Sequence, residues 1–269
     1  GKVTRTTTVW QNKSYDAGQY GTSVLGDIIG SGKFTFPKSV YAVMDTLKYF
    51  IANKENALVV DFFAGSGTTM HAVNLLNSID NGHRRCIMVT NNEVSADEAK
   101  ALDEKGYRPG DKEWDRLGIA RYVTWPRTVC SIKGCNIDGK PLDGNYGCNV
   151  EQYTEIEGEF VNPETGKKIR GKVYKKEKEP AYPELADLKM SDGFKTNAVF
   201  FKLSFLDKTS VALGRQFSEL LPVLWMKGGA IGKCPALESD GLPEMLILPQ
   251  NKMAVLIVEI YYSEFDAEL

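Results

Sequence analysis

Nine consecutive residues bring together a carboxylate, two glycines and three hydroxyl groups, the combination in this sequence best suited to holding a polar ligand. They are Asp61, Phe62, Phe63, Ala64, Gly65, Ser66, Gly67, Thr68 and Thr69. Because glycine lacks a Cβ, Gly65 and Gly67 permit a sharp turn and a close approach of backbone N–H groups to a ligand. The string predicts a binding site for a nucleotide or a carboxylate, where the plain alternative is a tight turn.

The elements that must position this loop are a strand before it and a helix after it. The apolar run Ala57–Val60 is too short for a helix and predicts a buried strand at about 58–63. Met70–Leu76 has the apolar spacing of an amphipathic helix, predicted at about 68–78. Met70 stands where a dinucleotide fingerprint would have its third glycine, so the string is not that fingerprint.

Neighbouring segments continue the alternation of helices and strands. Apolar spacing predicts a helix at 39–53, with Ser39 at its start. Cys86–Thr90 is typical of a second strand, and Ser95 with Glu98 has the capping-box spacing that opens a helix. Strand, helix, strand and helix in succession predict an α/β fold with a right-handed parallel unit.

The rest of the sequence is more polar and less regular. We predict three domains, at 1–128 around the glycine loop, at 129–190 as a hairpin-rich polar insertion and at 191–269 as a small α+β domain. The elements expected in the remainder are a helix at 109–128, two strands around a turn within 160–170, a strand at 199–203, a helix at 211–224 and a strand at 253–260.

Composition and charge argue against several classes of protein. The chain is 42% hydrophobic and 25% charged, and no apolar run is long enough to span a membrane. A formal net charge of −2 gives no global sign of nucleic-acid binding. Five cysteines without a C-x-x-C pair, and only two histidines, predict no metal site. The odd cysteine count and the lack of a secretion signal indicate reduced thiols and a cytoplasmic protein.

The full string D-F-F-A-G-S-G-T-T resembles motif I of the amino-group DNA methyltransferases, in particular the modification subunits of type III restriction-modification systems. The resemblance runs from Tyr20 to Arg127 and more loosely to Leu203. It implies a Rossmann-like methyltransferase sheet, S-adenosyl-L-methionine as cofactor and a glycine loop that holds the methionine part. Thr68 and Thr69 then bind the methionine carboxylate, unless they only cap the helix.

Other positions that match the family extend the implied cofactor site. Thr22 and Ser23 match a step near the cofactor carboxylate, and Pro37 and Lys38 match motif X, which packs beside the methionine tail. The alternative for Pro37 and Lys38 is a helix start. Glu93 is the candidate acceptor for the ribose hydroxyls, because one carboxylate offers two oxygens to two vicinal donors. Its alternative is an exposed acid that favours the next helix N-terminus.

Asp61 and His71 are the remaining titratable residues near the loop. Asp61 either orients the loop or meets the cationic amino group of the cofactor, and the alternative is a structural acid at the strand end. His71 lies on the predicted helix and is more typical of packing than of catalysis, so it is assigned no role.

The catalytic loop of the family is missing from this sequence. The family methylates an exocyclic amine with a [D/N/S]-P-P-[Y/F/W] loop, acting on a base flipped out of the duplex. The chain has 11 prolines and no two are adjacent, while Asn162-Pro163 lacks the second proline and the aromatic residue. We therefore assign no catalytic residue and expect the cofactor half of an adenine methyltransferase, cut from a longer protein and inactive alone. One edge of its sheet should lack a partner strand.

Three alternatives to that interpretation stay open. They are a cytosine-directed enzyme, an RNA or small-molecule methyltransferase, and a non-catalytic binding or assembly module. The resemblance implies DNA as a partner through the full-length protein, either a restriction subunit or a second copy as protein partner, and no membrane. Seven of the twelve residues from Lys167 to Lys178 are basic, and phosphates attract such charges. The candidate DNA contacts are Lys167, Lys168, Arg170 and Lys172, with a solvated charged face as the alternative.

Overall fold

The structure is a computed structural model that describes residues 9–202, 207–209, 217–229, 233–237, 245–248 and 253–256. The chain divides into two compact units, residues 1–200 and 201–269. The glycine loop (Asp61–Thr69) and the polar hairpin (149–180) both lie in the first unit. The domain boundaries expected from the sequence, at 128 and 190, stay predictions.

The strand, loop, helix and strand around the glycines form in the predicted order. Strand β1 (Leu58–Asp61) and strand β2 (Arg85–Met88) pair in parallel, with Val59 opposite Cys86, and helix α3 (Thr68–Asp80) connects them. Within the described residues this parallel sheet has two strands. A mixed α/β fold is therefore confirmed, whereas the wider Rossmann-like sheet stays a prediction.

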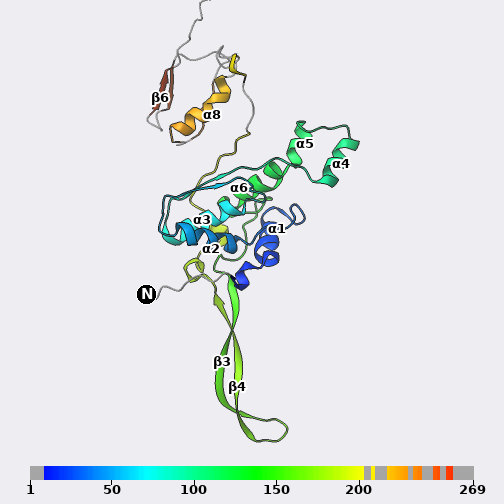
Figure 1. Cartoon of the computed structure of the whole chain (residues 1–269), viewed down its shortest axis with the longest axis vertical. Helices are drawn as coiled ribbons and strands as arrows, with labels where there is room; N and C mark the ends of the chain where they lie inside the picture. Colours follow the sequence, from blue (N-terminus) through cyan, green and yellow to red (C-terminus); the bar gives the residue numbers. More distant parts are fainter. Residues whose placement is uncertain are drawn as a thin grey trace, which may run out of the picture. The chain divides into compact units, whose positions relative to one another are not determined.

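Helix α2 (Val40–Ile51) packs against α3 and forms the main core with it (Figure 1). The helix predicted at 39–53 is confirmed, and the Ser39 side chain caps it by accepting a hydrogen bond from the Ala42 N–H. The two helices share a cluster of buried side chains with the segments on both sides of the hairpin at 149–180. Its central members are Val40, Tyr41, Met44, Ala72, Leu75, Leu76, Tyr146, Tyr182, Leu185 and Phe194.

A second apolar cluster joins the N-terminal helical turns to a helix after the sheet. Helix α1 (Val24–Ile29) packs on helix α6 (Trp125–Lys133) in this cluster. Shorter helical turns complete the first unit: η1 (Lys13–Tyr15), η2 (Gly18–Ser23), η4 (Pro183–Leu185) and η5 (Met190–Asp192).

The single helix predicted at 109–128 is wrong, because the chain forms three shorter pieces there. They are α5 (Lys112–Leu117), η3 (Ala120–Thr124) and α6. The backbone is extended at Gly118, and the Asn92 side chain fills the break. Its amide donates to the Asp115 carbonyl at 2.7 Å and accepts from the Arg121 N–H at 3.2 Å. The Asn92 side chain, 23 and 29 positions from its two partners, therefore interrupts the helix after α5. The periodicity of residues 109–128 does not reveal such a distant contact.

The predicted hairpin is confirmed and is longer than expected. Strands β3 (Asn149–Val161) and β4 (Lys168–Pro180) pair antiparallel and form the ribbon that projects from the helices of the first unit in Figure 1. Glutamates of one strand meet lysines of the other in ion pairs. These pairs are Glu151–Lys176, Glu155–Lys172 and Glu159–Lys168.

Several remaining predictions have mixed outcomes. Helix α4 (Ala96–Glu104) begins at the predicted Ser95 cap, whose Oγ accepts from the Glu98 N–H. The strand predicted at 199–203 is wrong, since residues 199–202 are irregular and Leu203 lies outside the described residues.

The second unit contains helix α8 (Phe217–Lys227) and an antiparallel pair, β5 (Met245–Leu248) with β6 (Met253–Leu256). Residues 211–216 and 257–260 of the predicted helix and strand lie outside the described residues.

Candidate functional site

The turn between β1 and α3 requires both of its glycines. Gly65 and Gly67 have φ angles of +50° and +78°, a region that side chains with a Cβ rarely enter. A Cβ on Gly67 would lie 3.2 Å from the Thr124 Cγ2, and one on Gly65 would lie 3.3 Å from the Phe34 ring. The Thr124 hydroxyl of η3 donates to the Gly65 carbonyl at 2.6 Å, and this hydrogen bond holds the turn against η3.

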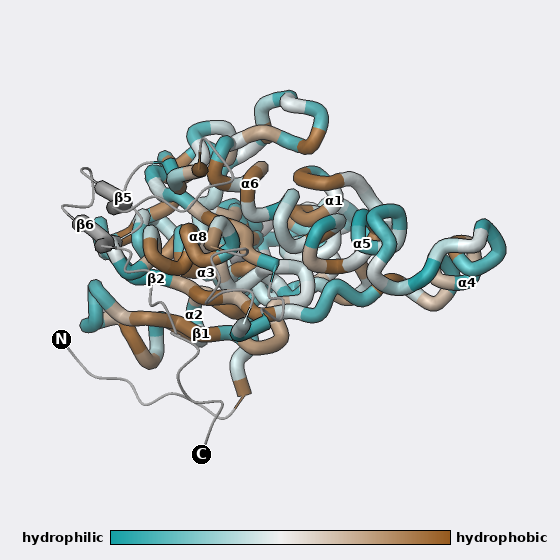
Figure 2. Tube along the Cα trace, turned by 90° about the horizontal axis from the view of Figure 1, so that it is seen from above, coloured by the Kyte–Doolittle hydropathy of each residue, from teal (hydrophilic) through white to brown (hydrophobic). Residues whose placement is uncertain are grey.

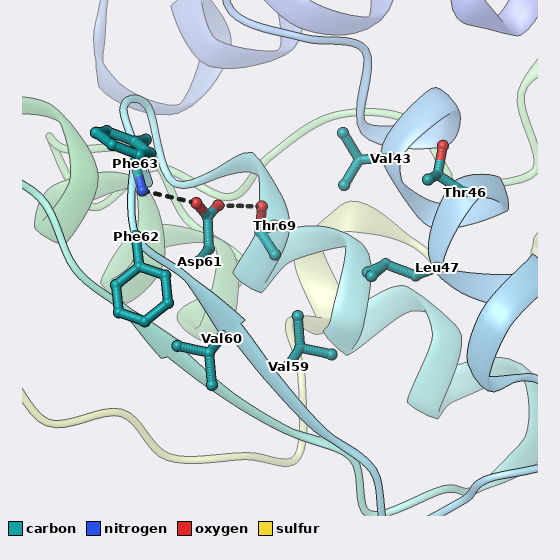
Figure 3. A pocket seen from close by; sticks show the side chains of 9 residues that line it. All are labelled: Val43, Thr46, Leu47, Val59, Val60, Asp61, Phe62, Phe63 and Thr69. Carbon is teal, nitrogen blue, oxygen red and sulfur yellow. Dashed lines mark hydrogen bonds between the residues drawn. The ribbon is translucent and has the colours of Figure 1, made fainter.

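Asp61 holds the loop with both of its carboxylate oxygens (Figure 3). One oxygen accepts from the Phe63 N–H at 3.0 Å and the other accepts from the Thr69 hydroxyl at 2.5 Å. The carboxylate therefore joins the end of β1 to the first turn of α3. This geometry fits the interpretation that Asp61 orients the loop.

The N-terminus of α3 keeps its backbone donors available. Gly67 is the N-cap residue and, among the described residues, gives no side-chain cap. The hydroxyls nearby have other partners, because Thr68 bonds with Ser66 at 3.0 Å and Thr69 bonds with Asp61. The first N–H groups of a helix lack intrahelical acceptors and carry the positive end of the helix dipole. Such an end is suited to an anionic group.

An apolar pocket of about 370 Å³ opens beside the loop. Figure 3 shows Val43, Thr46 and Leu47 of α2 on one side and Asp61 and Thr69 on the other. The remaining lining residues are Val59, Val60, Phe62 and Phe63. Phe63 is 93% exposed, which is unusual for a large apolar side chain. Apolar walls with a few polar groups at one end are typical of small-molecule sites.

Glu93 lies in the loop after β2 with an exposed carboxylate. The Glu93 backbone carbonyl accepts from the Ile119 N–H at 2.7 Å, which fixes the main chain at this point. One carboxylate oxygen accepts from the Asn91 amide at 3.2 Å. The cap of α4 is Ser95 and not Glu93, so the Glu93 side chain remains accessible to a ligand.

The two N-terminal motif segments lie against each other. A Cβ on Gly21 would stand 2.4 Å from the Pro37 carbonyl oxygen, so η2 touches the Pro37-Lys38 step. Pro37 is buried, while Thr22, Ser23 and Lys38 are exposed. The approach of the Phe34 ring to Gly65 brings the segment that contains Pro37 to the glycine loop.

His71 is buried, which fits the interpretation that this residue is more typical of packing than of catalysis. Its Nε2 lies 2.9 Å from the Tyr146 hydroxyl. Burial lowers the pKa of the imidazole well below its usual range, and the charge of Arg127 lowers this pKa further.

Besides Thr124, Arg127 is a residue at the loop that the sequence did not single out. It is fully buried, and its Nη1 donates to the Ser66 and Thr68 hydroxyls at 3.1 and 2.8 Å. The only sequence signal is its spacing, since Arg127 falls on the same face of α6 as the buried Cys130. Within the part of the chain that the structure describes, no group of His, Cys, Asp and Glu could hold a metal ion, and no helix is long and apolar enough to cross a membrane.

The segment that carries the glycine loop is similar to known proteins. Residues 2–100 match the profile of the DNA methylase family. The match covers 99 of the 269 residues of the chain. The resemblance to amino DNA methyltransferases is thereby confirmed for the methylase segment, by which we mean residues 2–100.

Individual relatives agree with the family match. The chain is 39% identical over 85 residues to the type II methyltransferase M.KpnI of Klebsiella pneumoniae, covering 32% of this chain and 20% of that protein. It is 38% identical over 100 residues to the Mod subunit of the type III restriction-modification enzyme EcoPI of Escherichia phage P1, covering 37% and 15%. The StyLTI Mod subunit of Salmonella typhimurium is 38% identical over 85 residues, covering 32% and 12%. The chain thus spans a fifth or less of the length of these relatives.

Proposed function

We propose that this chain binds S-adenosyl-L-methionine at the loop Asp61–Thr69, as the cofactor half of a site-specific DNA adenine methyltransferase of a restriction-modification system. The observation that carries the proposal is the uncapped N-terminus of α3 behind a turn of two glycines with positive φ. That end of the helix suits the methionine carboxylate, and the apolar pocket beside Asp61 suits the uncharged part of the nucleoside.

The ribose hydroxyls are assigned to Glu93. This side chain is exposed after β2, the strand that pairs in parallel with β1, and the carboxyl ends of parallel strands lie at one edge of a sheet. Two vicinal hydroxyls are donors that one carboxylate accepts together. Thr22, Ser23, Pro37 and Lys38 complete the proposed site from the N-terminal side.

The chain alone is proposed not to transfer the methyl group. Its 269 residues contain no pair of adjacent prolines, so the acid-or-amide, proline, proline and aromatic loop is not present. DNA recognition and any restriction subunit or second copy then belong to the whole protein. The second candidate function is a non-catalytic assembly module in which the loop is only a structural turn. The two hydrogen bonds of Asp61, which hold the loop through groups of the protein itself, favour that candidate.

Calorimetric titration of S-adenosylhomocysteine into the 269-residue chain tests this function. We expect saturable one-to-one binding that Glu93→Gln weakens about tenfold, because a hydrogen bond to a charged acceptor contributes about 1.5–3 kcal/mol. The matched control is Glu104→Gln, which changes a different exposed carboxylate at the end of α4. This change should leave the affinity unchanged. Absence of saturable binding in the folded chain contradicts the proposal and supports the assembly module.

A further inference from the structure

Arg127 is a buried cation without a counter-ion among the described residues. It is 0% exposed, and only its Nη1 has hydrogen-bond partners: the Ser66 hydroxyl, the Ser66 carbonyl and the Thr68 hydroxyl. The Nε and Nη2 atoms have no hydrogen-bond partner within the described structure. A buried charge without an opposite charge is costly, so its presence calls for an explanation.

The same chain shows how it satisfies a buried arginine that serves packing alone. The Arg84 side chain is also 0% exposed, but it pairs with both carboxylate oxygens of Asp80 at 2.8 Å. The Ile51 and Ala52 carbonyls accept its remaining N–H groups. Among the residues that the structure describes, no carboxylate pairs with Arg127, and Arg127 differs from Arg84 in its contacts with Ser66 and Thr68 of the glycine loop.

The positive charge of Arg127 adds to the positive end of α3. Ser66 and Thr68, its two partners, flank Gly67, which is the N-cap of this 13-residue helix. Burial lowers the pKa of Arg127 to about 10, so the guanidinium keeps its charge at neutral pH. The neighbouring His71 is neutral because burial lowers its pKa, so it neither adds to this charge nor cancels it. The buried charge and the helix dipole therefore both favour an anion at the N-terminus of α3.

We propose that Arg127 is a positioning residue that holds Ser66 and Thr68 and provides the buried positive charge that selects a carboxylate-bearing nucleoside at the N-terminus of α3. The counter-ion that the described residues do not supply is then the amino-acid carboxylate of the ligand. This inference rests on the proposed function, because it concerns the same site. It adds a residue outside the methylase segment and a specific basis for discrimination between ligands.

The test compares two nucleosides that differ in the amino-acid part. S-adenosylhomocysteine carries the carboxylate and the amino group, and 5′-methylthioadenosine has the same adenosine and sulfur without either. In calorimetric titrations of the full chain, Arg127→Met should weaken binding of S-adenosylhomocysteine at least about tenfold, as expected for loss of a nearby charge. Binding of 5′-methylthioadenosine should change less than about twofold, because its contacts do not involve the charge. Arg127→Lys, which retains the charge, should recover part of the lost affinity.

Arg84→Met is the matched control, because it removes the other buried guanidinium, away from the loop. It should lower stability without changing the ratio of the two affinities. An Arg127→Met chain that loses both nucleosides equally overturns the inference, since that result indicates a purely structural role. Wild-type chain that binds both nucleosides with equal affinity also overturns it, and this measurement needs no variant. If the wild-type chain binds neither nucleoside, the proposed function itself is contradicted. Failure of the proposed function is thus distinguished from failure of the inference about Arg127.

Discussion

At the scale of single residues, the loop is held by contacts that join it to three different elements. Asp61 connects β1 to Thr69, Thr124 connects η3 to Gly65, and Arg127 connects α6 to Ser66. The sequence predicted the loop and Asp61, because their pattern is local. It could not predict Thr124 or Arg127, because these residues reach the loop only through the packing of helices some 60 positions later.

His71 gives a pH dependence of stability that belongs to this scale. The folded pKa lies below that of the unfolded chain, so the unfolded state binds more protons below about pH 6.5. Stability contributed by neutral His71 is present above pH 6.5 and is lost as the pH falls, by at most about 1.4 kcal/mol per pH unit. Urea unfolding between pH 5 and 8 should show this slope in the wild type and a smaller slope in His71→Gln.

The exposed His83 provides the matched control for that measurement. His83→Gln should keep the wild-type slope. A wild-type slope in His71→Gln would show that other groups cause the loss of stability at low pH.

At the scale of elements, the sequence predicted those whose signals are local. Helix α2 with its Ser39 cap, the β1–α3–β2 unit and the polar hairpin all formed where periodicity and turn residues indicated. The helix expected at 109–128 failed because Asn92 breaks it from a distance. The strand expected at 199–203 failed although four of its five residues are apolar or aromatic, because no strand within the described residues pairs with it.

Gly67 should tolerate alanine far less well than Gly139, although both have φ near +80°. The left-handed backbone costs about 1–2 kcal/mol in either variant. Only Gly67→Ala adds a Cβ contact at 3.2 Å with Thr124, whereas nothing lies within 4 Å at Gly139. Unfolding in urea should therefore show a larger loss of stability for Gly67→Ala. Equal losses in the two variants would contradict the packing of the loop on η3.

Ion pairs within the hairpin limit which of its basic residues are available to contact DNA phosphates. Seven acidic and seven basic residues lie between 149 and 180, so the ribbon has no net charge. Lys168 and Lys172 already pair with glutamates of β3, whereas Lys167 and Arg170 make no ion pair within the described residues. The predicted phosphate contacts therefore fall mainly to Lys167 and Arg170.

Replacing Lys167 and Arg170 together by glutamine should reduce affinity for duplex DNA several-fold at low salt and lower the salt slope by about 2. The matched control, glutamine at Lys168 and Lys172, should have a smaller effect. Fluorescence anisotropy across a salt series measures both. Equal effects from the two pairs would mean that the glutamates do not neutralise their partners.

At the scale of the whole molecule, the parallel sheet of the first unit has an exposed apolar face. Leu58, Val60, Ile87 and Val89 are each between 44% and 50% exposed, and Figure 2 colours the chain around β1 as hydrophobic. Parallel sheets are normally covered on both faces. Within the described residues no third strand pairs with this sheet, and the unpaired edge expected from the sequence stays a prediction.

The exposed face should make the isolated chain self-associate. Val60→Thr with Ile87→Thr, at paired positions of β1 and β2, should reduce self-association seen by sedimentation velocity. Val161→Thr changes a more exposed valine on the hairpin and should have no effect. If the double variant associates as strongly as the wild type, another surface drives the association.

Binding of S-adenosyl-L-methionine by the glycine loop is the central claim, and amide hydrogen exchange with and without S-adenosylhomocysteine tests it most directly. The free N–H groups at the start of α3 should gain protection when a carboxylate accepts their hydrogen bonds. We predict slower exchange in peptides that cover 61–70 and 91–93, with no change in peptides from the hairpin at 149–180. Unchanged exchange at 61–70, at ligand concentrations that saturate calorimetric binding, would contradict the claim.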